Sequence, residues 1–591
     1  MLKGLNPQQL QAVTSTSPVI LCLAGAGSGK TTVLTRRISH LFNEHRIGTT
    51  NMLALTFTRL AGKEMKERVI KLIGEEHGKQ LFCGTFHAFC VSVLKRWGHK
   101  IGLDQNFTIY DQEDREEILK RIITEFGSVT TVKRILEVAE FDIWPLPKYV
   151  EEARVHKEYL YRLKQNNAID LDRLIIEVYR LWNNHSEALI EYQQNYTHVF
   201  VDEFQDTSDD QMRMLQLLKP KNFFVVGDDF QAIYGWRRAK VEYILNFPDQ
   251  YPDCEVIKLE DNYRSTEQVV SAANKLIKHN TSQTEKILIA HKSGADVLTF
   301  CYENATQEAI TIAKQIEYMH QEFNVSYKDI AVLARTNDRV DSLCWHLEQK
   351  QIPAHRVAGR DDPYKAPTVR PIIDWMYFLY NLSDDIAAKK IIRGKVTALK
   401  VTELEFRARG NDMSLYEAIV SDYELREITN IVNKLLCIIV EDRLYSPLEH
   451  FTAIRETLEL QTLNDMTQAE NAIFVWEKSK SDLGENYTVQ AFLKYLRYRD
   501  VQEKLIEERD AVKVMTIHAS KGLEFDTVFI AGMNQGVFPS KRGDLEEERR
   551  LFYVALTRAK NRLYITHPMI MNGWNGSPIE ALPSQFLGEI S

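Results

Sequence analysis

The sequence lacks the features of a membrane protein or a disulfide-bonded protein. No apolar run approaches the roughly 18 residues that a membrane-spanning helix needs, and the start, MLKGLNPQQLQAV, has no apolar signal-peptide core. The seven cysteines are odd in number and scattered, and they contain no CxxC pair. We therefore expect reduced core cysteines, no zinc or iron–sulfur site, and a cytoplasmic location.

The chain also lacks an excess of basic charge. Its formal net charge is −8 at pH 7, which excludes the global basic field of a protein that coats nucleic acid. Any contact with nucleic acid must therefore come from a local groove. With 591 residues, 44% of them hydrophobic, the chain is long enough for several cores and about four domains.

Glycine is absent from two long stretches, 128–226 and 411–483, and the second contains a single proline, Pro447. The segment 111–127 begins with Asp, carries apolar residues at helical spacing and ends in Gly, a pattern that predicts a helix. These features indicate two mainly helical insertions.

Short apolar, β-rich runs alternate with helical segments along the chain. The first group lies at 18–25, 52–58, 198–203, 222–228 and 254–260. The second group lies at 296–302, 329–335, 512–518, 526–532 and 562–566. Near-continuous apolar strands between helices are typical of parallel sheets covered on both faces. We predict an α/β protein with two cores, each interrupted by one helical insertion.

The segment AGAGSGKT (24–31) lies between a predicted strand and a predicted helix. In that context its glycines let backbone N–H groups wrap phosphates at a helix N-terminus. Lys30 is expected to reach the β- and γ-phosphates and Thr31 to bind Mg²⁺. The residues expected to bind nucleotide in this region are Ala24, Gly25, Ala26, Gly27, Ser28, Gly29, Lys30, Thr31 and Thr32.

A second apolar strand ends in adjacent carboxylates, in VFVDEFQDTS (199–208). Asp202 is expected to hold Mg²⁺ through water, and Glu203 to polarise an attacking water. Alone, an Asp-Glu pair after a strand is usually a solvated loop, but its pairing with a phosphate loop favours a catalytic role. A water-activating Glu also favours hydrolysis over a kinase reaction, for which no acceptor site is evident.

Two arginines are candidates for stabilising the charge that develops in phosphoryl transfer. Arg264 follows the last strand of the first core, beside Tyr263, whose ring suits stacking on a base. Arg558 lies near the end of a predicted helix in the second core. Each alone is more simply a surface arginine. Together they would make a cleft between the two cores close only around ATP.

The stretch VVGDDFQAIYGWRR (225–238) places acid, amide, aromatic and basic side chains on one turn after a strand. With this stretch, the series of motifs resembles the UvrD/Rep/PcrA-type superfamily 1A DNA helicases. The matches occur in family order at 5–13, 24–31, 54–69, 84–89, 201–208, 226–239, 259–265, 515–525 and 546–559.

The resemblance implies two RecA-like P-loop motor domains, each with a mainly helical inserted subdomain. The expected boundaries are 1–90 and 191–265 for motor domain 1A, 91–190 for insertion 1B, 266–380 and 509–591 for motor domain 2A, and 381–508 for insertion 2B. The family hydrolyses Mg-ATP between these motors to move 3′ to 5′ on single-stranded DNA and separate duplex. The implied partners are single-stranded DNA and duplex junctions, together with an unknown repair, replication or nuclease protein. No membrane contact is expected. The chain is expected to be a monomer or a weak dimer.

The resemblance also carries residue roles. Gln9 is expected to read the adenine edge, Tyr263 to stack on the base, Gln231 to sense the γ-phosphate and Glu524 to contact the ribose, with Arg264 and Arg558 as paired arginine fingers. Positions that match the single-strand track, or the motif joining nucleotide to strand, are Phe57, Thr85, His87, Tyr234, Trp236, His518 and Lys521.

Several positions depart from the family pattern. Phe230 replaces an Asp and Asp261 a Gln, and in the segment 391–418 Lys395 and Val396 interrupt an RGIG-type hairpin signature expected to meet duplex DNA. One alternative is therefore a DNA-dependent ATPase that serves a nuclease or other partner without processive unwinding. An RNA helicase is a second alternative, because nothing in the track rejects a 2′-hydroxyl.

Overall fold

The structure is a computed structural model, and it describes residues 2–140, 150–357, 364, 366, 368–392, 395–441, 446–460, 464–482, 487–498, 510–572 and 578–590. The chain divides into two compact units. Unit 1 contains residues 1–86, 190–359 and 500–591, and unit 2 contains residues 87–189 and 360–499. Within the described ranges, no helix is long and apolar enough to cross a membrane.

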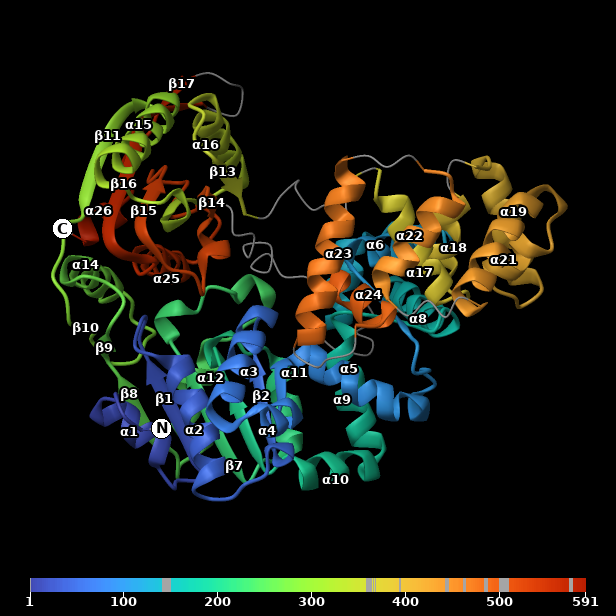
Figure 1. The fold of residues 1–591 in the computed structure, drawn as a ribbon, viewed down its shortest axis with the longest axis horizontal. Helices are drawn as coiled ribbons and strands as arrows, with labels where there is room; N and C mark the ends of the chain where they lie inside the picture. Colours follow the sequence, from blue (N-terminus) through green and yellow to red (C-terminus); the bar gives the residue numbers. More distant parts are fainter. Residues whose placement is uncertain are drawn as a thin grey trace. The chain divides into compact units, whose positions relative to one another are not determined.

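The first sheet of unit 1 has six parallel strands in the order β3-β2-β6-β7-β1-β8 (Figure 1). The strands are β1 (Val19–Ala24), β2 (Met52–Thr56), β3 (Phe82–Thr85), β6 (His198–Val201), β7 (Asn222–Gly227) and β8 (Glu255–Leu259). The five predicted strands of this core are confirmed. The sequence did not predict β3, because this short strand is only partly buried and has no continuous apolar run.

The second sheet of unit 1 has the order β11-β16-β15-β12-β14-β13, with β17 pairing antiparallel to β16. Its strands are β11 (Leu298–Asn304), β12 (Ile330–Ala334), β13 (Ala354–Arg356), β14 (Val512–Thr516), β15 (Phe525–Ala531), β16 (Ala559–Asn572) and β17 (Pro578–Glu580). The second group of predicted strands is also confirmed. The order of these strands makes residues 510–572 part of a sheet that begins before residue 300, so the sheet is interrupted in sequence.

The helices of unit 1 pack on these sheets with clear start signals. Asn6 and Gln9 form a capping box at the start of α1, and Ser208 and Gln211 form one at the start of α11. The helices are α1 (Pro7–Thr14), α2 (Lys30–Asn43), α3 (Arg59–Ile73), α4 (Glu75–Gln80), α11 (Asp209–Leu218), α12 (Glu242–Leu245), α13 (Phe247–Gln250), α14 (Glu267–Ile277), α15 (Ala305–Phe323), α16 (Asn337–Gln349), α25 (Leu545–Leu556) and α26 (Phe586–Glu589). A short ladder joins β9 (Asp261–Asn262) to β10 (Ile289–Ala290).

Unit 2 is mainly helical. Its helices and those at its boundaries are α5 (Phe86–Trp97), α6 (Gln112–Glu125), α7 (Val132–Glu140), α8 (Val150–Gln165), α9 (Arg173–Asn184), α10 (Ser186–Asn195), α17 (Arg370–Tyr380), α18 (Asp385–Ile392), α19 (Ala398–Gly410), α20 (Leu415–Val420), α21 (Arg426–Glu441), α22 (Pro447–Thr457), α23 (Asn464–Asp482) and α24 (Val489–Tyr498). Asp111 caps α6, as the sequence predicted. The small parallel ladder of β4 (Thr108–Tyr110) and β5 (Ala168–Asp170) was not predicted.

Unit 2 brings together helices from both expected insertions. The Tyr110 hydroxyl donates to Asp384 Oδ1 at 2.6 Å, and Lys390 pairs with Asp114 at 2.6 Å. The unit begins at residue 87 and takes in residues from 360, whereas the expected insertions began at 91 and 381. The expected boundary at 508–509 lies outside the described residues, as do Arg393 and Gly394 of the hairpin segment.

The buried strands of the first sheet give a stability prediction. Phe200 on β6 is 1% exposed, whereas Val256 on the edge strand β8 is 40% exposed. We expect Phe200→Ala to lower the free energy of unfolding by about 3–5 kcal/mol, because it leaves a cavity. Val256→Ala should cost under about 1 kcal/mol. Urea denaturation checks this, and equal losses in the two variants would contradict it.

Candidate functional site: a nucleotide pocket

The loop after β1 has the backbone geometry of a phosphate-binding loop. Gly27 and Gly29 adopt φ angles of 68° and 86°, in the left-handed region that favours glycine. A Cβ at Gly27 would lie 2.7 Å from the Cβ of Arg264. The helix α2 begins at Lys30, so its free N–H groups point toward the loop. The structure therefore confirms the strand, loop and helix arrangement that the sequence predicted.

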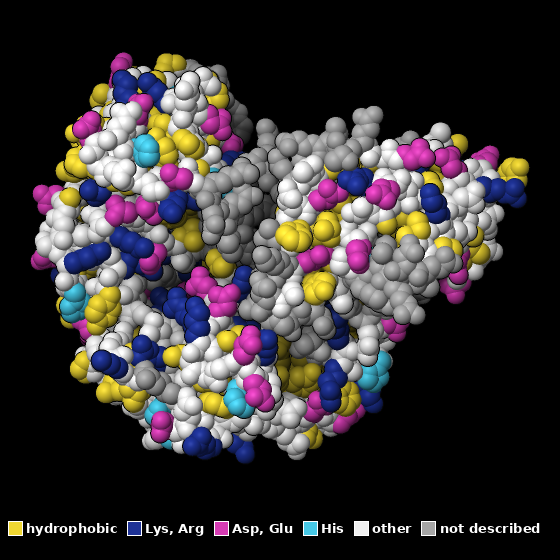
Figure 2. Space-filling view, in the orientation of Figure 1, with side chains coloured by type: hydrophobic (Ala, Val, Ile, Leu, Met, Phe, Trp, Pro, Cys, Tyr) yellow, Lys and Arg dark blue, Asp and Glu magenta, His cyan; other side chains and the backbone are white. Residues whose placement is uncertain are grey.

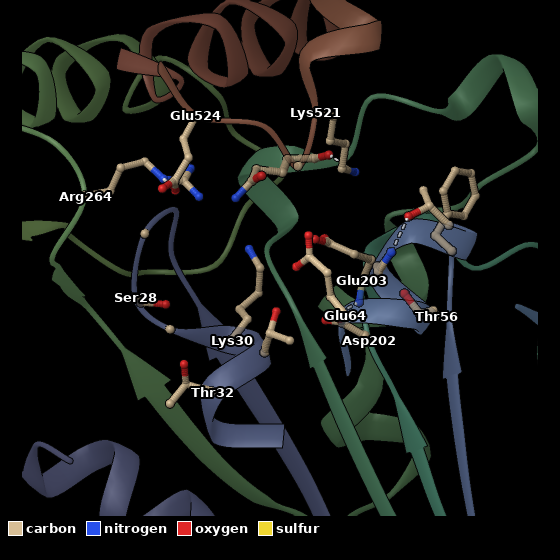
Figure 3. A pocket seen from close by; sticks show the side chains of 18 of the residues that line it. Ser28, Lys30, Thr32, Thr56, Glu64, Asp202, Glu203, Arg264, Lys521 and Glu524 are labelled. Atoms are coloured by element: carbon tan, nitrogen blue, oxygen red, sulfur yellow. Dashed lines mark hydrogen bonds and ion pairs between the residues drawn. The ribbon is translucent and has the colours of Figure 1, made fainter. Parts of the chain in front are cut away.

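A single pocket of about 530 Å³ collects most of the predicted nucleotide residues. Figure 3 shows Ser28, Lys30 and Thr32 on the loop and helix start, with Asp202 and Glu203 after a neighbouring strand. Predicted residues that line the pocket are Gly25, Gly27, Ser28, Gly29, Lys30, Thr31, Thr32, Phe57, Asp202, Glu203, Gln231, Tyr234, Tyr263, Arg264, Lys521, Glu524 and Arg558. The pocket is thus lined by residues from the loops and helix ends beside both sheets of unit 1.

The two carboxylates after β6 have different electrostatic environments. Burial and the neighbouring Glu203 raise the pKa of Asp202. Burial also opposes the ionisation of Glu203, but Lys30 and Lys521 outweigh it and lower the pKa of Glu203. Glu203 has a left-handed backbone, with φ at 51°, and Gln205 Nε2 donates to its Oε2 at 2.6 Å. The strained backbone and this hydrogen bond hold an ionised carboxylate in the pocket.

Lys521, which was predicted among the DNA contacts, also lines this pocket. Its Nζ donates to Asp206 Oδ2 at 2.5 Å and to the Gln231 carbonyl at 2.7 Å. Burial raises the pKa of Asp206 to about 6, with Lys521 opposing the shift. Lys521 therefore links the acid-bearing loop after β6 to the turn after β7.

The two candidate arginines both face the pocket. Arg558 Nη2 lies 3.5 Å from Gln231 Oε1, and its Nε donates to the Val554 carbonyl at 2.9 Å. Burial, followed by the nearby Arg264, lowers the pKa of Arg558 to about 9, so it stays protonated at neutral pH. Arg264 Nε donates to Glu524 Oε2 at 2.6 Å (Figure 3).

Glu524 also pairs with Lys560 at 2.8 Å. Burial opposes its ionisation, but Arg264 and Lys560 lower the pKa of Glu524 to about 2. Glu524 is therefore an ionised partner of both Arg264 and Lys560. Lys560, which also lines the pocket, was not predicted, because it has no motif position of its own.

The base side of the pocket is built around Tyr263, which is 50% exposed. His291 stacks on its ring, with centroids 5.0 Å apart and planes 8° apart, and Asp261 Oδ1 lies 2.7 Å from His291 Nε2. Asn6 Nδ2 donates to the Tyr263 hydroxyl at 2.9 Å and to Asp261 Oδ2 at 2.7 Å. Gln9 Nε2 donates to the Ser28 carbonyl at 2.9 Å. Asp261, a departure from the family pattern, thus orients the side chains around Tyr263.

The remaining loop residues lie beneath the pocket surface. Ala24 and Ala26 are fully buried and do not line the pocket. Asn262 Nδ2 donates to the Ala26 carbonyl at 2.7 Å, so a residue of β9 fixes the backbone of the loop. Asn262 and Gln205 lie inside the motifs, but their roles were not predicted, because each bonds to the backbone of a distant segment, at Ala26 and Asp228 respectively.

The turn after β7 carries an aromatic cluster. Phe57 and Tyr234 stack with centroids 4.9 Å apart, and Trp236, which is 62% exposed, meets His518 at 6.3 Å edge-to-face. Arg237 lies over the Trp236 ring at 4.7 Å. Burial, followed by Arg335 and Arg237, lowers the pKa of His518 to about 4, so it is neutral at pH 7. Four predicted DNA contacts therefore lie together beside the nucleotide pocket.

The other two predicted DNA contacts lie at the end of β3 and just after it. Thr85 is the last residue of β3, paired in register with Thr56, and is buried. His87 lies on α5, at the first residue of unit 2. Figure 2 shows acidic and basic side chains interspersed over the described part of the visible face, without a continuous basic surface there.

Comparisons with known proteins give the same family along the whole chain. The profile of the UvrD/REP helicase N-terminal domain matches residues 5–252, and that of the UvrD-like helicase C-terminal domain matches residues 257–568. The ATP-dependent DNA helicase PcrA of Staphylococcus epidermidis is 34% identical over all of this chain and 87% of its own length. The protein with the same name from Staphylococcus aureus is 33% identical over all of this chain and 86% of its own length.

The stack of His291 on Tyr263 gives a prediction for nucleotide binding. We expect His291→Ala to raise the KM for ATP about two- to tenfold, because an aromatic pair contributes about 0.5–1.5 kcal/mol beyond its buried area. The turnover number should change little, since His291 is remote from Lys30 and Glu203. Steady-state ATPase kinetics check this, with Tyr263→Ala as the reference. A normal KM in His291→Ala beside a raised KM in Tyr263→Ala would contradict it.

Proposed function

Because the chain belongs to the UvrD/Rep helicase family, we propose that it is an ATP-dependent DNA helicase that translocates 3′ to 5′ on single-stranded DNA. The relatives named above are ATP-dependent DNA helicases. The observation that carries the proposal is the pocket in which Lys30, Glu203 and Arg558 converge from two parallel sheets. We further propose that the protein is cytoplasmic and that it is a monomer or a weak dimer. We also propose the division into motor domains 1A and 2A and insertions 1B and 2B with the boundaries given above.

The chemistry of the donor set fits Mg²⁺ bound together with ATP. Thr31 and Asp202 offer a hydroxyl and a carboxylate oxygen, the hard ligands that Mg²⁺ prefers. No group of three or more His, Cys, Asp or Glu side chains in the described part of the chain could hold a metal. That agrees with a cation that keeps waters and phosphate oxygens as its other ligands. When bound, Mg²⁺ would neutralise phosphate charge.

Glu203 is the proposed general base. Its carboxylate is ionised because Lys30 and Lys521 outweigh the cost of burial, and Gln205 fixes one of its oxygens. An ionised carboxylate in hydrogen-bond reach of a water can accept the proton that the water loses on attack. Lys30 would hold the β- and γ-phosphates by charge, from the start of α2.

The paired arginines are the proposed charge-stabilising groups of the transition state. Arg558 comes from the second sheet and already lies 3.5 Å from the Gln231 side chain. Arg264 is bound to Glu524, so its move to a phosphate would release Glu524 for the ribose hydroxyls. Fixed positive charge at the transferring phosphoryl group is the main protein contribution to such reactions.

Movement on DNA is proposed to begin at the turn after β7. Gln231 and Tyr234 both line the pocket, and Trp236 follows within two residues. We propose that a base stacks against Tyr234 and Trp236, with Phe57, Thr85, His87 and His518 along the track. Aromatic faces accept any base, which suits a motor that ignores sequence.

The nucleotide chemistry gives the main test of the proposed function. We expect DNA-stimulated ATP turnover to fall about a hundredfold or more in Lys30→Ala, because the phosphate charge loses its partner. Glu203→Gln should fall about 10²- to 10⁴-fold through loss of the base. Lys71→Ala, an exposed change on α3, is the matched control and should behave like the wild type.

The same preparations, given 3′- and 5′-tailed duplexes with ATP, test polarity and unwinding. Displacement of the 3′-tailed duplex alone supports the helicase. Turnover without displacement would favour the translocase that serves a partner. Retained turnover in Lys30→Ala would exclude this pocket as the ATPase site, and stimulation by RNA equal to that by DNA would favour an RNA substrate.

The turn after β7 gives a second functional prediction. We expect Trp236→Ala to raise the DNA concentration for half-maximal ATPase about 5- to 150-fold, because a stacked base contributes about 1–3 kcal/mol. Its KM for ATP should stay near the wild-type value. Gln231→Ala should instead bind DNA normally, lower the DNA-stimulated turnover number about 10- to 100-fold and move less for each ATP hydrolysed, measured by displacement of a protein block from single-stranded DNA. Identical phenotypes in the two variants would argue against this division of roles.

A further inference from the structure

A buried lysine outside every predicted motif lies behind the turn after β7. Lys286 belongs to the segment 280–288, which connects α14 to β10. Its side chain is 0% exposed, and its Nζ lies 2.9 Å from Asp228 Oδ1 and pairs also with Asp229. The same Nζ lies 3.6 Å from the centre of the Phe230 ring, a cation–π contact. One cation therefore contacts three consecutive residues of the turn.

The two carboxylates that Lys286 contacts have separate partners. Asp229 accepts from the Thr284 backbone N–H at 2.8 Å and from the Thr284 hydroxyl at 2.7 Å, so it ties the turn to the segment 280–288. Asp228 instead accepts from Gln231 Nε2 at 2.6 Å. Asp228 therefore connects Lys286 to Gln231, which is proposed to face the nucleotide. Asp229 instead connects Lys286 to Thr284, in the segment 280–288.

The charge of Asp228 decides which way the Gln231 amide faces. An ionised carboxylate can only accept hydrogen bonds, so Gln231 must present its NH₂ group to Asp228. Its Oε1 then faces Arg558 Nη2, at 3.5 Å, as an acceptor facing a cation. A protonated Asp228 could donate to the Gln231 carbonyl, and the amide could then turn its NH₂ group toward Arg558. The amide orientation thus depends on a cation close to Asp228.

We propose that Lys286 is a positioning residue of the ATPase reaction, acting through Asp228 to hold the Gln231 amide in its phosphate-sensing orientation. The inference rests on the proposed function, which places Gln231 at the γ-phosphate. Lys286 contacts no residue that we place on the nucleotide, so its effect must pass through the turn. Asp228 is 0% exposed and ionised, because Lys286 and Lys30 outweigh burial and lower its pKa.

The segment that carries Lys286 is also anchored to α25, the helix that leads to Arg558. Arg549 Nη1 donates to Asn280 Oδ1 at 2.6 Å, and Arg550 Nη2 donates to the Ser282 carbonyl at 2.7 Å. Glu546 Oε1 accepts from the Thr281 backbone N–H at 2.7 Å. The segment 280–288 therefore holds Gln231 through Lys286, and holds the helix before Arg558 through these three contacts.

The test compares Lys286→Met, which keeps the length of the stem and removes the charge, with Asp228→Asn, which removes the acceptor-only carboxylate. We expect each to lower the DNA-stimulated turnover number about 10- to 100-fold, as loss of a supporting contact does elsewhere. The KM for ATP and the affinity for a fluorescent ADP analogue should stay within about threefold, because the contacts to nucleotide remain. The double variant Lys286→Met with Asp228→Asn should turn over no more slowly than the slower single variant. Both changes disrupt the same series of contacts, from Lys286 through Asp228 to Gln231, so their effects should not multiply.

Thr284→Val is the matched control, since it removes contacts to Lys286 and Asp229 and leaves Asp228 and Gln231 untouched. It should keep turnover within about twofold of the wild type, a bound set by the usual small effect of a single neutral hydrogen bond. Where Lys286→Met alone does not fold, Lys286→Met with Asp229→Asn replaces it, because one carboxylate charge is removed together with the cation.

Normal turnover in the folded Lys286→Met variant, or in its paired form, would overturn the proposal. So would multiplying losses in the double variant, or a fall in turnover that Thr284→Val reproduces. These results differ from failure of the proposed function, in which the wild type itself shows no DNA-stimulated turnover.

Discussion

The nucleotide pocket depends on the balance of buried charge at one edge of the first sheet. Asp202, Asp206 and Asp228 are almost fully buried there, beside the partly buried Glu203. Burying several carboxylates together is strongly unfavourable unless cations offset the loss of water. Lys521 forms an ion pair with Asp206, and Lys286 forms one with Asp228. Lys30 lowers the pKa of Glu203. Asp206 and Asp228 thus each have a direct lysine partner, and Asp202 and Glu203 remain as the pair proposed for the chemistry.

The order of the parallel strands brings these groups together and explains what the sequence could predict. The loops after β1, β6 and β7 each form a contiguous motif, and these strands are neighbours in the sheet. Lys30, Glu203 and Gln231 could therefore be found from local pattern and family resemblance. Lys286 and His291 could not, because each acts on a residue at least 28 positions away in sequence and has no pattern around it. The ladder of β4 and β5 was missed for a similar reason, since two short strands leave no periodic signal.

Two departures from the family pattern are explained by one region of the chain. Phe230, at a position where the family pattern led us to expect Asp, packs under Lys286 and meets Tyr553 edge-to-face at 5.5 Å. Asp261, at a position where the pattern led us to expect Gln, contacts His291 and Asn6. Lys286 and His291 lie five residues apart, on either side of β10. The effects of Phe230 and Asp261 on the site therefore depend on Lys286 and His291, which contact them.

The helix α25 contacts the turn after β7 at two points, and this limits how the turn can move. Near the start of the helix, Glu547 Oε1 accepts from the Gly235 backbone N–H at 3.0 Å, between the two aromatic residues proposed to meet DNA. In the last turn of the helix Tyr553 packs on Phe230, and just past the end Arg558 faces Gln231. Under the proposed function, a shift of α25 toward a γ-phosphate would also displace the part of the turn that carries Tyr234 and Trp236. The contacts of α25 with this turn, together with those of Lys286, would then link hydrolysis to movement.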